Sequence, residues 1–157
     1  MKKIGLFLVA LLGGMMLSAA EMPDFSKAET WKKAGWNKSV YSRSENGVLT
    51  IERTLPGSGA WYAVPFAVTP GKKLTGTVDI AYLNAEGKGV ARLGYNFLNA
   101  AGKRVLFYNV ANVTSPNGGF ETRKFSFKVP EGAEKVSIYI CLDGIGKAEF
   151  RNVQIDK

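Results

Sequence analysis

From Val48 to the C-terminus, apolar and polar side chains alternate in short segments that are separated by Gly, Pro and Asn. The clearest example places Val136, Ile138, Ile140 and Leu142 at every second position. Successive side chains of a β-strand point to opposite faces, whereas a helix would need a period of 3.6 residues. The pattern therefore predicts an all-β fold, a two-sheet antiparallel β-sandwich in which each strand has one apolar face. We expect strands over residues 48–53, 60–69, 73–83, 90–98, 104–110, 120–129, 135–142 and 148–155.

The first twenty residues differ in character from the rest of the chain. Lys2 and Lys3 precede an uncharged apolar run over residues 4–17, and Ser18-Ala19-Ala20 follows it. This arrangement is typical of a cleaved signal peptide. The run is shorter than the roughly 20 residues that a hydrocarbon core requires, so we expect no membrane span. No cysteine follows the run, so we expect no lipid anchor. The interpretation is a signal peptide over residues 1–20 and a single secreted or periplasmic domain over residues 21–157.

Composition excludes several kinds of site. The chain has no histidine and a single cysteine, Cys141. These counts exclude Ser-His-Asp and Cys-His catalysis, histidine metal ligands, an internal disulfide and a thiolate zinc site. The 21 Lys and Arg residues outnumber the 13 Asp and Glu residues, which suits an acidic partner such as a uronic-acid polysaccharide, an anionic surface or nucleic acid. Export argues against a nucleic-acid partner, and the scattered positions of the charges are also explained by solubility alone.

Side chains that alternate away from the core are the ones left to meet a ligand. Aromatic rings stack on the C–H faces of sugar rings, and amide, guanidinium and carboxylate groups bind the hydroxyls. The alternative is that the aromatic residues only cover the sheet. On this basis the predicted carbohydrate site contains Trp61, Arg92, Asn96, Tyr139 and Asp143, with Tyr108 as an additional member.

Four segments carry a resemblance to a known family: residues 68–74 (VTPGKKL), 98–103 (LNAAGK), 127–133 (FKVPEGA) and 146–155 (GKAEFRNVQI). Over about residues 25–157 the chain resembles the carbohydrate-binding modules of the xylan- and glucan-binding jelly-roll type, which share the galactose-binding-like β-sandwich. The resemblance implies a jelly roll that binds plant or algal polysaccharide without catalysis. The ligand would lie along the concave sheet or at an edge built by loops.

The same resemblance bears on metal binding. Members of this family often hold a structural calcium ion, in part through an aspartate at the position of Arg151. A guanidinium cannot coordinate Ca²⁺, which needs hard oxygen ligands, although backbone carbonyls with Asp24 or Glu149 offer oxygens nearby. We therefore expect no cofactor.

Two other functions use the same fold. A small glycan-active enzyme needs two paired carboxylates, but no motif pairs the candidates Glu45, Glu52, Asp79, Glu121, Asp143 and Glu149. An extracellular or cell-surface module could instead bind a protein partner, since fold does not determine function. A flat apolar patch or an unpaired, uncharged edge strand would favour a protein partner over a sugar.

Overall fold

The structure, a computed structural model, describes residues 21–34 and 39–156. The predicted signal peptide, Trp36 and Lys157 lie outside the described residues. A short 3₁₀ helix, η1 (Ala28–Thr30), precedes the strands. The strands are β1 (Trp31–Lys33), β2 (Ser39–Arg43), β3 (Leu49–Arg53), β4 (Ser58–Ala63), β5 (Phe66–Ala67), β6 (Lys73–Leu98), β7 (Arg104–Val113), β8 (Glu121–Lys128) and β9 (Lys135–Asp156). All strand pairs are antiparallel.

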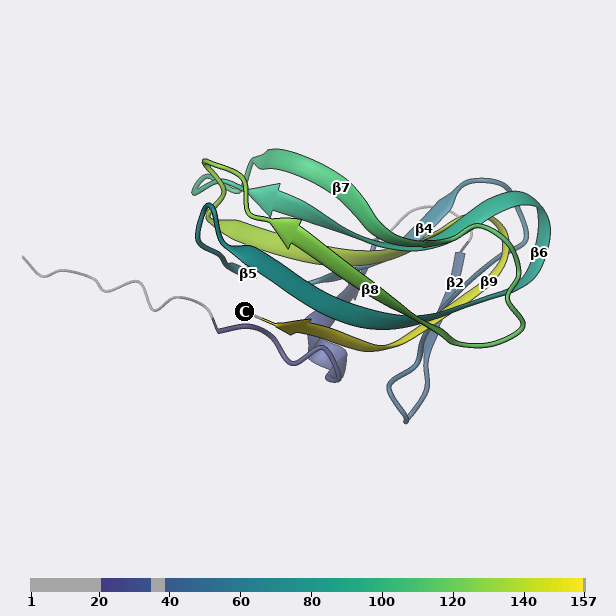
Figure 1. The fold of residues 1–157 in the computed structure, drawn as a ribbon. Helices are drawn as coiled ribbons and strands as arrows, with labels where there is room; N and C mark the ends of the chain where they lie inside the picture. Colours follow the sequence, from purple (N-terminus) through teal and green to yellow (C-terminus); the bar gives the residue numbers. More distant parts are fainter. Residues whose placement is uncertain (1–20, 35–38, 157) are drawn as a thin grey trace, which may run out of the picture.

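Two strands are much longer than the alternation predicts. The expected loop over residues 84–87 lies inside β6, and the segments 135–142 and 148–155 belong to the single strand β9. Both strands bend where residues adopt positive φ, at Asn84 and Gly87 in β6 and at Gly144 and Gly146 in β9. Glycine and asparagine adopt this conformation more readily than other residues, and the β6–β9 pairing shifts register here, between Leu83 and Glu86 and between Glu86 and Val90. Figure 1 shows β6 turning over at one end of the molecule, so that its two halves run in different layers.

The bends divide the ladder into the two layers of a sandwich. Sheet 1 contains residues 73–86 of β6 and 145–156 of β9, which pair with each other. It continues through β8 on one side and through β3 and β2 on the other. Sheet 2 contains residues 90–98 of β6 and 135–143 of β9. It continues through β7 on one side and through β4 and β1 on the other, with β5 pairing the start of β9. The predicted all-β, two-sheet architecture is confirmed.

The core lies between the two sheets and follows the predicted alternation. On β9 the side chains of Val136, Ile138, Ile140 and Leu142 are fully buried. Sheet 1 meets them with a second buried row, which includes Val78, Ile80, Tyr82, Ala148 and Phe150. Side chains on the outer face of sheet 2 are left to form a surface.

The N-terminal segment closes one edge of the sandwich. Trp31 is 5% exposed, its indole lies 5.9 Å from the Phe25 ring, and its Nε1 donates a hydrogen bond to the Phe25 carbonyl at 2.9 Å. Within residues 21–34 and 39–156, no helix has the length and apolar character needed to cross a bilayer.

Candidate functional site

Four of the six predicted site residues share the outer face of sheet 2. In the β6–β9 ladder, Arg92 pairs with Cys141, Gly94 with Tyr139, and Asn96 with Ser137. Their sequence neighbours Leu93, Tyr95, Phe97, Ile138 and Ile140 are in the core, so these residues point away from it. We call this surface the Tyr139 face. It comprises Ser58, Ala60 and Tyr62 of β4, Arg92, Gly94 and Asn96 of β6, Phe107 and Asn109 of β7, and Ser137, Tyr139, Cys141 and Asp143 of β9.

Tyr139 occupies the centre of this face. Its side chain is 3% exposed because the Phe107 ring stacks on it, with centroids 5.4 Å apart and planes 5° apart. The Tyr62 ring lies 5.6 Å away on the other side. The Tyr139 hydroxyl donates a hydrogen bond to Oδ1 of Asn109. Burial raises the pKa of Tyr139 well above its ordinary value, so the phenol remains a neutral donor.

Gly94 makes this arrangement possible. It lies directly opposite Tyr139 in the ladder, and a Cβ built on it would collide with the hydroxyl and ring of Tyr139. The same Cβ would lie 2.6 Å from the carbonyl oxygen of Tyr108. Contacts this short do not occur in packed proteins, so the glycine provides the space that the tyrosine ring fills.

An ion pair lies at one end of the face. Arg92 pairs with Asp143, and both side chains are about three-quarters buried. The hydroxyl of Ser58 donates a hydrogen bond to Asp143 Oδ1, and the Cys141 thiol lies 3.5 Å from the same oxygen. Burial raises the pKa of the Cys141 thiol above its ordinary value, although the charge of Arg92 opposes this. The Asp143 carboxylate is therefore neutralised and oriented by its neighbours.

The predicted outward position of Trp61 is wrong. Trp61 is 7% exposed and belongs to the core, where its ring meets Tyr41 edge-on at 5.5 Å. Alternation was expected to continue through residues 60–69, but β4 ends at Ala63, and Val64 and Pro65 separate it from β5. Proline has no amide hydrogen to donate to the ladder. The alternation of buried and exposed side chains in β4 therefore does not continue beyond Pro65. Tyr62, not Trp61, faces outward.

Tyr108 is exposed, but it is not on the Tyr139 face. It pairs with Tyr95, which points into the core, and the two rings stack with centroids 6.2 Å apart. Its neighbour Phe107 pairs with Asn96 and so lies on the Tyr139 face. The sequence gives no signal for Phe107, because residues 105–108 are all apolar and such a run has no alternation that would assign it to a face.

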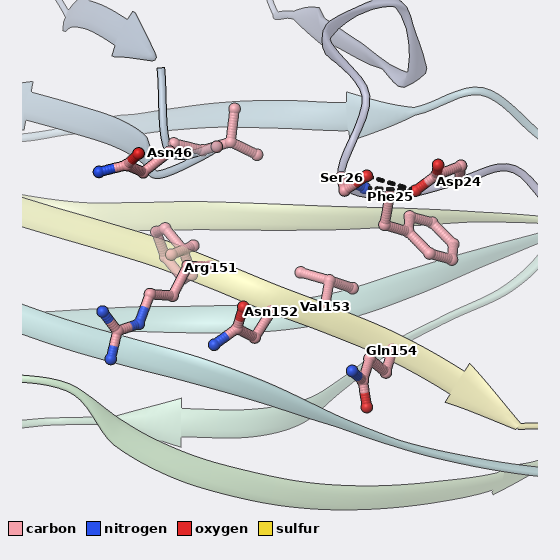
Figure 2. Close-up of a pocket in the computed structure, with 11 residues that line it drawn as sticks. Asp24, Phe25, Ser26, Asn46, Arg151, Asn152, Val153 and Gln154 are labelled. Carbon is pink, nitrogen blue, oxygen red and sulfur yellow. Dashed lines mark hydrogen bonds between the residues drawn. The ribbon is translucent and has the colours of Figure 1, made fainter. Parts of the chain in front are cut away.

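A separate pocket of about 220 Å³ lies between the N-terminal segment and β9 on sheet 1. Figure 2 shows Arg151, Asn152 and Gln154 projecting from β9, with Asn46 and the Asp24–Ser26 pair across from them. Asp24 accepts hydrogen bonds from the Ser26 amide at 2.9 Å and from the Ser26 hydroxyl at 2.6 Å. The Ser26 hydroxyl and amide lower the pKa of Asp24, which is fully exposed.

The donor set around this pocket does not fit the calcium ion that the family resemblance implies. Arg151 lies where the aspartate would be, pairs with Asp79 at 3.3 Å, and covers the Phe120 ring at 3.9 Å. Arg43 donates a hydrogen bond to the Ser26 carbonyl. Within residues 21–34 and 39–156, no three His, Cys, Asp or Glu side chains come together as a metal-binding group. Two guanidinium groups therefore stand beside a single pocket carboxylate, which is unfavourable for a divalent cation.

No protein-family model matches the sequence, and no curated protein matches it. Solved structures do match. The C-terminal family 22 carbohydrate-binding module of Clostridium thermocellum Xyn10B superposes with a TM-score of 0.60 and 11% identity, covering 87% of this chain and 93% of that module. The chain has the fold of the family 22 carbohydrate-binding modules.

Two larger proteins contain the same fold as one part. The N-terminal CBM22-1–GH10 modules of the same xylanase, solved with xylohexaose, match with a TM-score of 0.59 and 17% identity over 81% of this chain. The enzymatically active domain of bacteriophage CBA120 tailspike protein 4 matches with a TM-score of 0.59 and 16% identity over 83% of this chain. This chain spans only 26% and 20% of those two structures, respectively.

Proposed function

We propose that this chain is a non-catalytic carbohydrate-binding module that holds a polysaccharide on the Tyr139 face. The observation that carries the proposal is the Phe107 ring. It is 45% exposed, lies on the outer face of a sandwich with the fold of sugar-binding modules, and is supported from below by Tyr139. An exposed aromatic ring held flat by a second ring is a platform on which the C–H face of a sugar can stack.

Polar groups beside this ring can bind the sugar hydroxyls. Asn96 is paired with Phe107 in the ladder and is partly exposed, and its amide offers both a donor and an acceptor. The carboxamide of Asn109 retains its two N–H donors, since its oxygen is taken by the Tyr139 hydroxyl. The guanidinium carbon of Arg104 lies 5.6 Å from the centroid of the Phe107 ring, and its N–H groups add further donors. Stacking with flanking hydrogen bonds is the chemistry that oligosaccharide recognition requires.

The outer face of sheet 2 has too few carboxylates for glycoside hydrolysis, which favours binding without catalysis. Asp143 is the single carboxylate on the outward positions of the described sheet 2 strands, and it is committed to Arg92 and Ser58. Glycoside hydrolysis uses two carboxyl groups, about 5 to 9.5 Å apart on either side of the bond that breaks. The Tyr139 face offers one that is already neutralised.

The test is retention in polysaccharide affinity gels. Phe107→Ala should weaken binding to a retaining polysaccharide about fivefold, the loss expected from one aromatic contact. Leu55→Ala is the matched control, because Leu55 is also 45% exposed but lies outside sheet 2. Equal retention of the two variants would remove Phe107 from the site. A native chain that binds no member of a broad glycan array would refute the function.

The proposed setting is outside the cytoplasm, with residues 1–20 as a cleaved signal peptide. The support is the sequence of a charged start, an apolar run and small residues before Glu21. Expression of the full chain followed by N-terminal sequencing of the exported protein should give Glu21 as the first residue. Recovery of the protein only from the cytoplasm, with Met1 still as its first residue, would contradict the proposed signal peptide.

One observation favours a protein partner as the second candidate. Val105, Leu106, Phe107 and Tyr108 are consecutive and are 41% to 59% exposed. They lie on β7, which pairs only with β6 in the described part of the chain. Leu106 pairs with the core residue Phe97, so its side chain lies on the side opposite the Tyr139 face. Leu106→Lys should leave glycan retention unchanged. A blank glycan array, together with a protein complex that Leu106→Lys abolishes, would favour this second function.

A further inference from the structure

The Tyr139 face and the outward positions that border it on sheet 2 carry more positive charge than the binding of a neutral sugar requires. Lys32 pairs with the outward-facing Tyr62, and the neighbouring pair Trp31 and Ala63 is in the core. Lys135 precedes the core residue Val136, so it points outward with Ser137 and Tyr139. These two lysines, Arg92 and Arg104 face one neutralised carboxylate, that of Asp143.

Arg104 and Lys135 lie at one end of the face. Both pair with Leu98 of β6, from opposite sides of that strand. Two strand spacings separate them, which is about 10 Å. The Arg104 guanidinium lies 5.6 Å from the centroid of the Phe107 ring, which stacks on Tyr139. Arg104 therefore lies close to the central aromatic residues.

Three of the four cations have no carboxylate partner among the described residues. Arg92 is paired with Asp143, whereas Lys32, Arg104 and Lys135 form no ion pair with a residue in the described part of the chain. Sheet 1 contains both kinds of cation: Lys147 pairs with Glu149 at 2.5 Å and Arg151 pairs with Asp79, whereas Lys124 forms no ion pair with a described residue. Unpaired cations around an aromatic platform attract an anionic ligand, and a guanidinium matches a carboxylate in shape and charge.

We propose that the ligand of the Tyr139 face is a carboxylated polysaccharide, a uronic-acid glycan, whose carboxylates are bound by Arg104 and Lys135 while a sugar ring stacks on Phe107. This rests on the proposed carbohydrate-binding function and specifies its substrate class. The stacking contact supplies affinity for any pyranose, and the two cations supply the preference for a charged one.

The experiment compares one backbone with and without its charge. Calorimetric titrations of residues 21–157 would use polygalacturonate, the same polymer after carboxyl reduction, and a neutral xylan. We expect polygalacturonate to bind about tenfold more tightly than its reduced form at low salt, and the difference to shrink as salt screens the ion pairs. Arg104→Gln should weaken polygalacturonate binding about fivefold and leave binding of the reduced polymer nearly unchanged.

Lys124→Gln is the matched control. Lys124 is an exposed cation on β8 of sheet 1 that forms no ion pair with a described residue. It should have no effect on either titration. Equal affinities for the charged and reduced polymers would overturn the substrate class while leaving the carbohydrate-binding function standing. Equal losses in Arg104→Gln and Lys124→Gln would show attraction by net charge alone and would also overturn it. Failure to bind all three polymers and the glycan array would refute the carbohydrate-binding function itself.

Discussion

Replacing Gly94 by alanine tests the packing on which the candidate site depends. The added Cβ would collide with the hydroxyl and ring of Tyr139 and lie 2.6 Å from the Tyr108 carbonyl oxygen. Tyr139 is held between Phe107 and Tyr62 and is 3% exposed, so its ring has little room to retreat. We expect the Tyr139 ring to be displaced away from Gly94, which disrupts both its stacking on Phe107 and its hydrogen bond to Asn109.

The free energy of unfolding should fall by about 1 to 2 kcal/mol. Overpacking costs about 1–3 kcal/mol, and replacing a glycine within a strand offsets about 0.5–1 kcal/mol of that loss. For a chain of this size, 2 kcal/mol corresponds to a melting temperature lower by about 7 °C. Glycan retention should fall with it, because the Phe107 platform loses its support.

The assay is urea unfolding of residues 21–157 in a double-mutant cycle with Tyr139→Ala. Without the tyrosine ring, most of the collision disappears, so Gly94→Ala should cost little or become slightly stabilising. Gly119→Ala is the control, because a Cβ there meets no atom within 4 Å. An equal cost of Gly94→Ala with and without the Tyr139 ring would refute the steric reasoning, as would a cost no larger than that of Gly119→Ala.

EDTA should not change the melting temperature of residues 21–157, because Arg151 and Arg43 stand where a calcium site would need oxygens. A fall of several degrees that CaCl₂ reverses would contradict this. Burial raises the pKa of Asp79, but hydrogen bonds from Thr122, Asn152 and Arg151 outweigh it and leave the pKa below 3.8. The stabilisation is therefore complete above about pH 4 and is lost as the pH falls through the lowered pKa, so Asp79→Asn should show a shallower loss of stability in acid urea titrations than the native chain. A steeper loss of stability in Asp79→Asn than in the native chain would contradict the lowered pKa of Asp79. The Cys141 thiol, 5% exposed with its pKa raised by burial, should react with a thiol reagent far more slowly in the native state than in urea. Equal reaction rates in the native state and in urea would place the Cys141 thiol at the protein surface.

The fold, and the shared face of four candidate residues, could be predicted from the sequence. Alternation over residues 90–98 and 135–142 assigned Arg92, Asn96, Tyr139 and Asp143 to one surface. These segments are central in sheet 2, paired on both sides, and keep one phase through their length. A central strand with one buried face must alternate, so its sequence carries the information about its faces.

Alternation assigns Trp61 to the wrong face and does not indicate that Phe107 faces outward. The phase of β4 does not carry across Val64 and Pro65, so extending it placed Trp61 outside. On β7, residues 105–108 are apolar throughout, because an edge strand with both sides partly exposed is not constrained to alternate. The faces of both strands follow from pairing: Trp61 opposite Ile140, and Phe107 opposite Asn96.

By itself, the sequence determined that this chain forms strands, which positions of the central strands are buried, and that histidine chemistry and an internal disulfide are absent. Tertiary structure alone decided that β6 and β9 bend through both layers, and that Gly94 provides space for Tyr139. It also decided that Phe107 and Tyr62 pack against that ring, and that Lys32, Arg104 and Lys135, which form no ion pair with a described residue, share the outer face of sheet 2. The physical reason is one of range. Alternation records whether a side chain meets water or the core, whereas pairing between distant strands determines which neighbours it meets.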